Sequence, residues 1–178
     1  MGVPASIPFV SEHAAAGQER LEQEVVALFD QLRTPLFRFL LGQGLDAADA
    51  EEVIQEAFLA LFEHLRSEKP RTNLRGWVFK VAHNQALKLL RRSGARATPL
   101  EDFAAAPDPT PEQRVQDNQR YRQLLAVMRA LGPQDRAVLQ LRAEGLRYRE
   151  IAGVLDISLG SVAVSMERAL ARIEAARQ

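Results

Sequence analysis

The sequence lacks cysteine altogether, and it contains no long apolar run. Without cysteine the chain forms no disulfide and no thiolate metal site, which suits a reducing compartment. A membrane-spanning helix needs about 20 predominantly apolar residues in a row, and no stretch approaches that length. Residues 1–17 also lack the basic start and the apolar stretch of a signal peptide. We therefore expect a cytoplasmic protein without membrane insertion.

The motifs typical of hydrolases, metalloenzymes and nucleotide-binding enzymes are also missing. The sequence contains no HExxH pair, no glycine-rich phosphate loop and no serine in a nucleophile context. The three histidines, His13, His64 and His83, lie in separate segments, and we interpret His64 as a polar surface residue. These absences predict a protein that is not an enzyme, has no catalytic residue, and holds no metal ion and no cofactor.

The net charge is zero, but the charges are strongly sorted along the chain. Residues 1–65 hold three basic and eleven acidic side chains, whereas residues 66–96 hold nine basic side chains and one acidic. Residues 97–113 carry four acidic side chains and no basic one, and residues 114–178 hold eleven arginines against seven acids. Local charge decides which partners a surface attracts, so this sorting points to separate anionic and cationic partners.

Almost every periodic segment has helical spacing. Apolar residues recur every three or four positions over residues 21–40, 53–65 and 115–131, which is typical of amphipathic helices. Pro35 interrupts the first of these segments, and we expect it to kink or split that helix. The few β-branched runs lie inside helical spacing, so the sequence predicts an all-α fold.

A stretch rich in proline, alanine and acidic residues at 97–111 has no periodicity, which is typical of a flexible linker. It divides the chain into two small helical domains, expected at residues 20–96 and 112–178. Residues 1–19 are expected to form a flexible leader. The predicted architecture is therefore two helical domains on a linker.

Residues 145–169 have the spacing of a helix-turn-helix. Ala152 is small where the two helices cross, Asp156 suits a left-handed turn, and Ser158 is a suitable cap for the second helix. A structural helical hairpin needs the same residue types, so both interpretations fit. The stretch from Ser158 to Glu167 has no lysine or arginine, although binding to DNA usually draws on cations.

The basic segment 66–96 has an aromatic component, because Trp77 and Phe79 lie among its cations. Aromatic rings beside cations suit single-stranded nucleic acid, since bases stack on the rings while the cations follow the phosphates. The alternative is that Trp77 belongs to the core and the cations form a solvated face. The acidic helix expected over 46–65 likewise suits a basic partner, or is only a well-capped amphipathic helix.

Three segments resemble a known family in their order and spacing. They are "DAADAEEVIQEAFLALFEHL", "NLRGWVFKVAHNQALKLLRR" and "GPQDRAVLQLRAEGLRYREIAGVLDISLGSVAVSMERALARI". Together they are similar to the extracytoplasmic-function (ECF) group of the sigma-70 family of bacterial RNA polymerase sigma factors, over about residues 20–96 and 112–177. The resemblance implies a DNA-binding transcription factor that directs promoter recognition, DNA melting and transcription initiation. The first domain then corresponds to the sigma region 2 bundle and the second to the sigma region 4 helix-turn-helix.

The resemblance also implies roles for residues of the first domain. The acidic helix is expected to bind the β′ clamp helices of core RNA polymerase through Asp49, Glu52, Gln55, Glu56 and Phe58. The loop 66–73 is expected to capture a base flipped from the −10 promoter element, and the next helix to lie on the melting DNA. The −10 residues implied are Arg66, Lys69, Arg71, Asn73, Arg75, Trp77, Lys80, Asn84, Lys88, Arg91 and Arg92.

In the second domain, the resemblance implies contacts with the polymerase β flap and with the −35 promoter element. The −35 residues implied are Arg147, Arg149, Ser158, Ser161, Ala163, Ser165, Arg168 and Arg172. The family's usual basic or polar contact positions are occupied by Ala163, Ser165, Glu167 and Leu170. Because base-specific contacts need arginine, lysine, asparagine or glutamine, we expect weak or atypical reading of the −35 element.

Two other functions also fit the sequence. One is a helix-turn-helix transcriptional regulator that binds duplex DNA without polymerase. The other is a sigma-like interaction protein whose C-terminal domain binds a regulator, which the apolar second helix favours. An anti-sigma factor is an expected partner in either sigma-like case.

Overall fold

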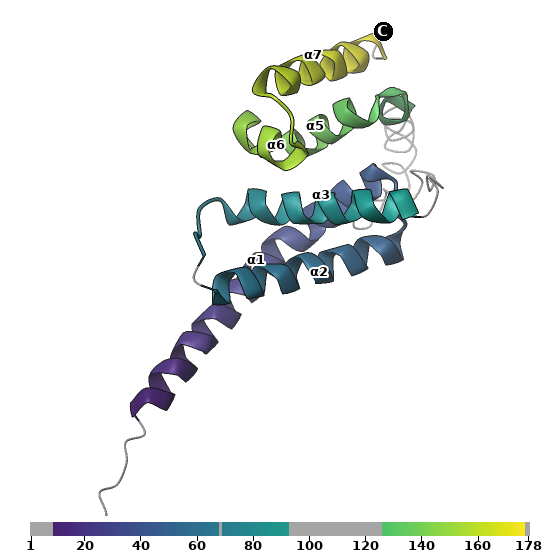
Figure 1. Cartoon of the computed structure of the whole chain (residues 1–178). Coiled ribbons are helices and arrows are strands. Elements are labelled where there is room, and N and C mark those ends of the chain that lie inside the picture. The colour runs from purple at the N-terminus through teal and green to yellow at the C-terminus, as the bar shows by residue number, and fades with distance from the viewer. Residues whose placement is uncertain (1–8, 68, 93–125, 177–178) are drawn as a thin grey trace, which may run out of the picture.

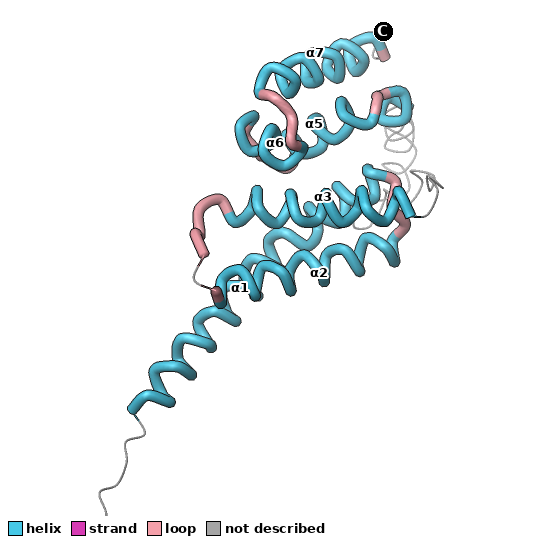
Figure 2. Tube along the Cα trace, viewed as in Figure 1, coloured by secondary structure: helices cyan, strands magenta, loops and turns pink. Residues whose placement is uncertain are grey.

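The computed structural model describes residues 9–67, 69–92 and 126–176 of the chain (Figure 1, Figure 2). These residues form helices joined by short turns, and no strand occurs among them, so the predicted all-α class is confirmed. The helices are α1 (Phe9–Gln43), α2 (Ala47–Arg66), α3 (Leu74–Arg92), α5 (Pro133–Ala143), α6 (Tyr148–Leu155) and α7 (Leu159–Ala175). Residues 126–130 add a short helical stretch before α5.

The first three helices, here called the N-terminal unit, pack side by side (Figure 1). Their contact surfaces are the apolar stripes that the sequence periodicity predicts, and in α2 the stripe ends in the fully buried Leu61 and nearly buried Leu65. Two aromatic pairs meet edge to face, Phe29 with Phe58 at 5.0 Å and Phe39 with Phe79 at 5.6 Å between ring centroids. Burying each such side chain stabilises the fold by roughly 1.5–3 kcal/mol.

One prediction about α1 is wrong, and of the kink or split expected at Pro35 only the split is excluded. Residues 9–19 form its first turns, so the expected flexible leader does not extend through them; their alanine-rich composition favours a helix. In Figure 1 this end of α1 extends beyond α2 and α3. Pro35 lies within α1, and the helix is not split there. The lost hydrogen bond is offset by packing, since Leu32 and Leu36 on either side of Pro35 are buried in the core.

The turn between α1 and α2 uses residues suited to it. Gly44 has a φ of +101°, which a residue with a Cβ rarely adopts. Asp46 then caps α2, because its Oδ1 accepts a hydrogen bond of 2.8 Å from the backbone N–H of Asp49.

Residues 126–176, here called the C-terminal unit, contain the predicted helix-turn-helix. Gly145 has a φ of +88° between α5 and α6, and Asp156 has a φ of +55° between α6 and α7. Ser158 caps α7, with its Oγ accepting from the N–H of Ser161 at 3.0 Å. The predicted turn and cap are thus confirmed. Ile151 and Val162, from the two helices, are fully buried in the shared core.

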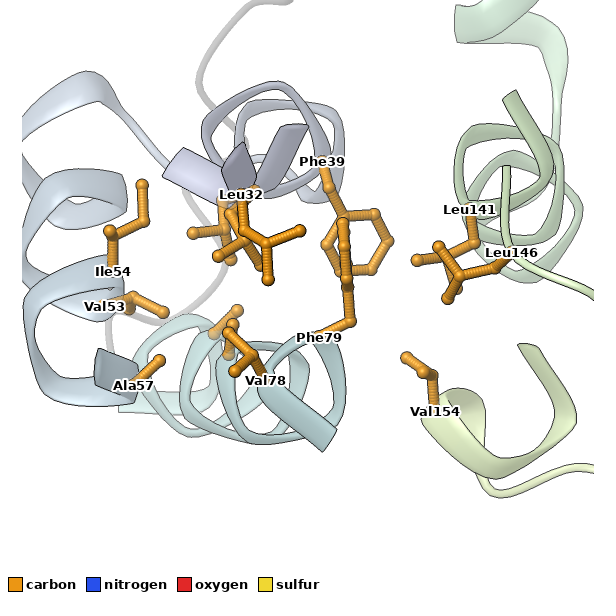
Figure 3. Packing of buried hydrophobic residues seen from close by; sticks show 14 of the residues in the cluster. Leu32, Phe39, Val53, Ile54, Ala57, Val78, Phe79, Leu141, Leu146 and Val154 are labelled. Atoms are coloured by element: carbon orange, nitrogen blue, oxygen red, sulfur yellow. The ribbon is translucent and has the colours of Figure 1, made fainter. Parts of the chain in front are cut away.

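The two units do not stay apart in this structure, because their apolar residues form one continuous core. Helix α3 contacts α6, and α1 contacts α5. Figure 3 shows Phe39 and Phe79 between the interior of the N-terminal unit and Leu141, Leu146 and Val154 of the C-terminal unit. Leu141 and Leu146 are at most 1% exposed. The expected linker at residues 97–111 lies outside the described residues, as does the start of the expected second domain.

Polar contacts border this apolar contact surface. Arg38 of α1 donates two hydrogen bonds to the carboxylate of Glu144, from Nε at 2.9 Å and from Nη2 at 2.8 Å. Nearby, Gly42 lies so close to the Gln140 side chain that a Cβ at this glycine would come within 1.6 Å of Gln140 Nε2. Arg136 Nη1 reaches the carbonyl oxygen of Gly42 at 3.5 Å. The end of α1 and the end of α5 are therefore fitted closely together.

In the described part of the chain, no helix is both long enough and apolar enough to cross a membrane.

Candidate nucleic-acid interface

Helix α3 carries a stripe of polar and cationic side chains in line with one aromatic ring. Successive residues of an α-helix are rotated by about 100°, so one face of α3 presents Trp77, Lys80, Asn84, Lys88 and Arg91. The polar members of this stripe are exposed and Trp77 is half-buried. The opposite face holds the buried Phe79 and His83. An aromatic ring followed by cations is the arrangement that suits a strand with stacked bases and a phosphate backbone.

The loop before α3, residues 69–73, is held against the N-terminal unit at several points. Arg71 pairs with Glu24 of α1. Asn73 has a φ of +52°, and its Oδ1 accepts a hydrogen bond of 3.1 Å from the N–H of Gly76, which caps α3. Asn73 is therefore the N-cap of α3. This cap joins the loop to α3, and Asn73 lies only four residues before Trp77, the first residue of the stripe.

His64, near the end of α2, contacts both this loop and the stripe. Its Nε2 lies 3.0 Å from the carbonyl oxygen of Pro70, and its ring centroid lies 4.6 Å from that of Trp77, at 39° between the ring planes. His64 is therefore a half-buried polar residue at the surface, and it also contacts the loop and Trp77. Trp77 is half-buried and packs against the core and on His64, which supports its assignment to the core in part, whereas its stacking on bases stays a prediction.

Other predicted −10 residues are engaged by the protein itself. Arg75 donates to the backbone carbonyl oxygen of Glu144 in the C-terminal unit, and Arg71 pairs with Glu24. The guanidinium carbon of Arg66 lies 6.0 Å from the centroid of the Phe62 ring. Lys69 and Arg92 are exposed. The structure therefore brings part of the predicted set into the stripe and turns Arg71 and Arg75 toward protein partners.

The polymerase-binding residues predicted on α2 do not all reach the surface. Glu52, Gln55 and Glu56 are exposed, and Asp49 is half-buried beside the cap of the helix. Phe58 is 6% exposed and packs on Phe29, so the prediction that it contacts a partner is wrong. Phe58 belongs to the buried stripe at helical spacing. The next residue, Leu59, is 62% exposed and is an apolar side chain at the surface of this face.

The predicted −35 face lies on α7 and at the start of α6. Exposed side chains are those of Arg147, Arg149, Ser158 and Ala163, and Ser161 is half-buried beside Ser158. Ser165 has no exposed surface, and its Oγ accepts a hydrogen bond of 2.9 Å from Gln134 of α5. The prediction that Ser165 contacts DNA is therefore wrong. Its position is internal because α7 turns this side toward α5.

Two predicted phosphate-binding arginines of α7 are also engaged inside the C-terminal unit. Arg168 pairs with Asp135 at 2.9 Å, and Arg172 donates to the carbonyl oxygen of Ala130 at 3.1 Å. The outer side of α7 presents apolar side chains instead, with Leu159, Val164 and Leu170 each about half exposed. This face therefore has little positive charge with which to bind DNA.

The arginine at the start of α6 does not cap that helix with its side chain, as expected for a group that only donates. Glu150 accepts a hydrogen bond of 2.7 Å from the backbone N–H of Arg147, so one end of the helix is still satisfied from within. This hydrogen bond partly replaces the one that a serine or threonine side chain at position 147 would accept as a helix cap.

His83 is buried on the inner face of α3, at 8% exposure, and its ring lies 6.0 Å from that of Phe39. Burial lowers the pKa of His83 from its usual value of 6.5. Its Nδ1 has no hydrogen-bond partner among the described residues. No group of His, Asp or Glu residues suited to hold a metal ion occurs among those residues either.

Three residues at these contacts were not singled out as functional from the sequence, namely Arg38, His64 and Glu144. Arg38 and Glu144 are 106 positions apart, and nothing local in the sequence signals their pairing. For His64 the sequence holds a weak signal of such a contact. The residue lies near the end of α2, whose inner face includes Phe58, Leu61 and Leu65. His64 is rotated by about 100° from Leu65 around the helix, so it lies at the border of that face, where it can reach the following loop.

Two family descriptions match the chain. Sigma-70 region 2 matches residues 28–96, and Sigma-70 region 4 matches residues 121–173. The first match covers the C-terminal part of α1, from residue 28 onward, with all of α2 and α3. The second covers α5, α6 and nearly all of α7.

Similar proteins with curated names agree with these matches. The chain is 36% identical over 126 residues to the ECF RNA polymerase sigma factor SigE of Mycolicibacterium smegmatis, covering 67% of this chain and 48% of that protein. It is 29% identical to a probable RNA polymerase sigma factor, RfaY, of Xanthomonas campestris, covering 90% and 41%. It is 27% identical to the RNA polymerase sigma factor CnrH of Cupriavidus metallidurans, covering 93% and 91%. The chain thus spans about half of the first two relatives and most of the third.

Two solved structures have a similar fold. One is the structure of CnrH in complex with the cytosolic domain of CnrY, with a TM-score of 0.62, 21% identity, and coverage of 91% of this chain and 92% of that chain. The other is the sigma factor RpoE in complex with the anti-sigma factor NepR from Bartonella quintana, with a TM-score of 0.64, 18% identity, and coverage of 89% and 96%.

Proposed function

Because the chain belongs to the ECF group of the sigma-70 family of RNA polymerase sigma factors, we propose that it binds core RNA polymerase and directs promoter recognition, DNA melting and transcription initiation. The observation that carries this proposal is the stripe on α3, where Trp77 lies in line with exposed Lys80, Asn84 and Lys88. We assign this stripe to the −10 element in its melted form. The protein acts without catalysing a reaction and works in the cytoplasm, where polymerase and promoter meet.

Two interactions with the stripe stabilise a bound single strand. A base stacked on an aromatic ring contributes about 1–3 kcal/mol, and Trp77 is the ring in this position. Each phosphate neutralised by Lys80 or Lys88 releases counterions and makes the slope of log K against log salt more negative by about 0.7. Stacking therefore holds the opened base while the lysines attract the backbone, and together they offset the cost of flipping a base.

The acidic face of α2 is assigned to core polymerase. It is supported by the exposure of Glu52, Gln55 and Glu56, with Leu59 as the neighbouring apolar contact. A basic helix of the polymerase clamp fits such a face by charge, and an exposed leucine adds desolvated area at its centre. The acidic face and the cationic stripe then serve different partners.

The C-terminal unit is assigned to the −35 element and the β flap, with weak or atypical reading of the DNA. Support comes from the uncharged run between Ser158 and Val164, the burial of Ser165, and the engagement of Arg168 with Asp135. Arg147 and Arg149 remain exposed at the start of α6 and suit phosphates. An anti-sigma factor is the proposed regulator, since both similar solved structures are complexes with a second protein.

In vitro transcription with core polymerase tests the proposal. We expect promoter-dependent initiation from genomic fragments, and loss of promoter opening, without loss of polymerase binding, in the double variant Lys80→Ala/Lys88→Ala. Arg20→Ala is the control, because it removes an exposed cation of α1 that is not part of the stripe. Polymerase binding without initiation by the unmodified chain would contradict the proposal.

A second experiment separates this function from a regulator that binds duplex DNA alone. The double variant Gln55→Ala/Glu56→Ala should abolish transcription and co-purification with core polymerase while leaving the fold intact. A stand-alone regulator would keep its activity. For the −35 element, selection of promoter sequences by the holoenzyme should give weak preference in the −35 region, and strong selection for a usual −35 box there would refute that part.

A further inference from the structure

The ring of His64 joins two parts of the proposed −10 surface that come from different segments. One contact is the hydrogen bond between Nε2 and the Pro70 carbonyl oxygen at 3.0 Å, and the other is the packing of the ring on Trp77 at 4.6 Å. A carbonyl oxygen only accepts, so Nε2 carries the proton in this contact.

The geometry points to a division of the Trp77 ring between protein and solvent. His64 covers part of the ring, at 39° between the ring planes, and Trp77 is half-exposed. A tryptophan on an exposed helix face without such support has freedom about two side-chain torsions. Packing on a neighbouring ring limits that freedom before any base arrives.

The same histidine fixes the loop that precedes the stripe. Of the loop 69–73, Pro70 is held by His64, Arg71 by Glu24, and Asn73 by its own cap on Gly76. The contact at Pro70 is the one that ties the loop to the side of Trp77. The loop and the ring are therefore positioned by one side chain.

We propose that His64 is a positioning residue for the −10 element, which presets the Trp77 ring and the loop 69–73 to receive an unstacked base. This rests on the proposed function of the α3 stripe. His64 itself need not touch DNA, because its effect runs through Trp77 and Pro70. A surface that is ordered beforehand loses less conformational freedom when it binds, and its affinity is higher for that reason.

Two variants separate the two contacts. His64→Phe keeps a ring beside Trp77 but removes the donor to Pro70, whereas His64→Gln keeps a donor but removes the ring. Glu63→Gln is the matched control, because Glu63 is the preceding exposed residue of α2. All are compared as holoenzyme with core polymerase, using a fluorescently labelled single-stranded oligonucleotide that carries the −10 sequence mapped by transcription.

We expect each His64 variant to weaken oligonucleotide binding by about fivefold, the factor for one hydrogen bond or one ring contact of ordinary strength. His64→Ala, which removes both contacts, should weaken binding more than either. Binding of a duplex −35 fragment should not change. Equal affinity of His64→Ala and the unmodified chain for the −10 strand would overturn the proposal.

The single tryptophan of the chain gives a second readout that a loss of stability alone does not produce. In the free protein, His64→Gln should shift the emission of Trp77 toward longer wavelength, because the ring loses its cover, and His64→Phe should shift it less. Unchanged emission in His64→Gln would also overturn the proposal. Thermal denaturation checks that both variants fold.

Failure of the proposed function has a different signature. If the unmodified holoenzyme does not initiate at any promoter, the sigma-factor function and the inference built on it both fall. If it initiates and the His64 variants bind and initiate equally well, only the positioning role falls.

Discussion

Replacing Glu144 with lysine is expected to separate the C-terminal unit from the N-terminal unit. Glu144 stands at the end of α5, with its side chain 14% exposed, and it accepts both hydrogen bonds from Arg38. Its backbone carbonyl also accepts a hydrogen bond from Arg75. Glu144 therefore accepts hydrogen bonds from two arginines of the N-terminal unit, Arg38 and Arg75.

The free energy that the pair of Arg38 and Glu144 contributes to closure can be judged from how exposed the two side chains are. Exposed ion pairs contribute about 0–1 kcal/mol, and hydrogen bonds to charged groups about 1.5–3 kcal/mol. Arg38 is 47% exposed, so solvent screens the pair and places it near about 1 kcal/mol. Glu144→Gln should then shift the balance between closed and open chains about fivefold. Glu144→Lys adds repulsion from Arg38, for roughly 2 kcal/mol in all and a shift of about thirtyfold.

Distance measurement between spin labels tests this directly, because the chain has no cysteine that would label in addition. Cysteines placed at Ala48 on α2 and Ala171 on α7, both exposed, report the separation of the units. We expect a longer-distance population in Glu144→Lys and a smaller one in Glu144→Gln. The exchange Arg38→Glu with Glu144→Lys should restore the short distance.

An unchanged distance distribution in Glu144→Lys would refute the reasoning, since it would show that the apolar contact through Phe39, Phe79 and Leu146 holds the units without the ion pair. Opening also has a consequence for DNA. Arg75, which donates to Glu144 in the closed chain, becomes available to the −10 strand, so Glu144→Lys should bind a single strand more tightly than the unmodified free chain.

Three further predictions concern single positions. Gly42→Ala should loosen the contact between the units, because its Cβ meets Gln140 Nε2 at 1.6 Å, and the same label pair should report a longer distance; Gly17→Ala, which meets nothing within 4 Å, should leave the distance unchanged. Asp46→Ala removes the cap of α2 and should lower the free energy of unfolding by about 1 kcal/mol in urea denaturation. His83→Leu should remove a pH dependence. Burial lowers the pKa of His83 in the folded chain, so the unfolded chain binds the proton more readily. The free energy of unfolding therefore falls as the pH drops below about 6.5, by at most about 1.4 kcal/mol per pH unit. Urea denaturation from about pH 7.5 to about pH 5 should show a smaller loss in the leucine variant than in the unmodified chain; an equal loss in both would contradict it.

The local elements were predictable because their signals are local. Helical periodicity, the caps at Asp46, Asn73 and Ser158, and the left-handed turn at Asp156 depend on residues three or four positions apart. Pro35 shows the limit of such signals, since the sequence argues for a break where the packing of Leu32 and Leu36 keeps the helix whole.

The exposure of individual site residues was less predictable. A family position says which residue type contacts a partner, whereas burial depends on which element packs on that side. Phe58 turned inward onto Phe29, and Ser165 turned inward onto Gln134 of α5. Both lie next to exposed positions, because one step along a helix rotates the side chain by about 100°.

The all-α class, the sorting of charge into an acidic α2 and a cationic α3, and the family could all be read from the amino-acid sequence. These follow from composition, periodicity and motif order, which folding does not alter. The tertiary structure alone decided that the two units share one core, that Arg38 meets Glu144 across 106 positions, and that His64 supports Trp77. Such contacts depend on the approach of surfaces distant along the chain, and their free energy exists only once those surfaces meet.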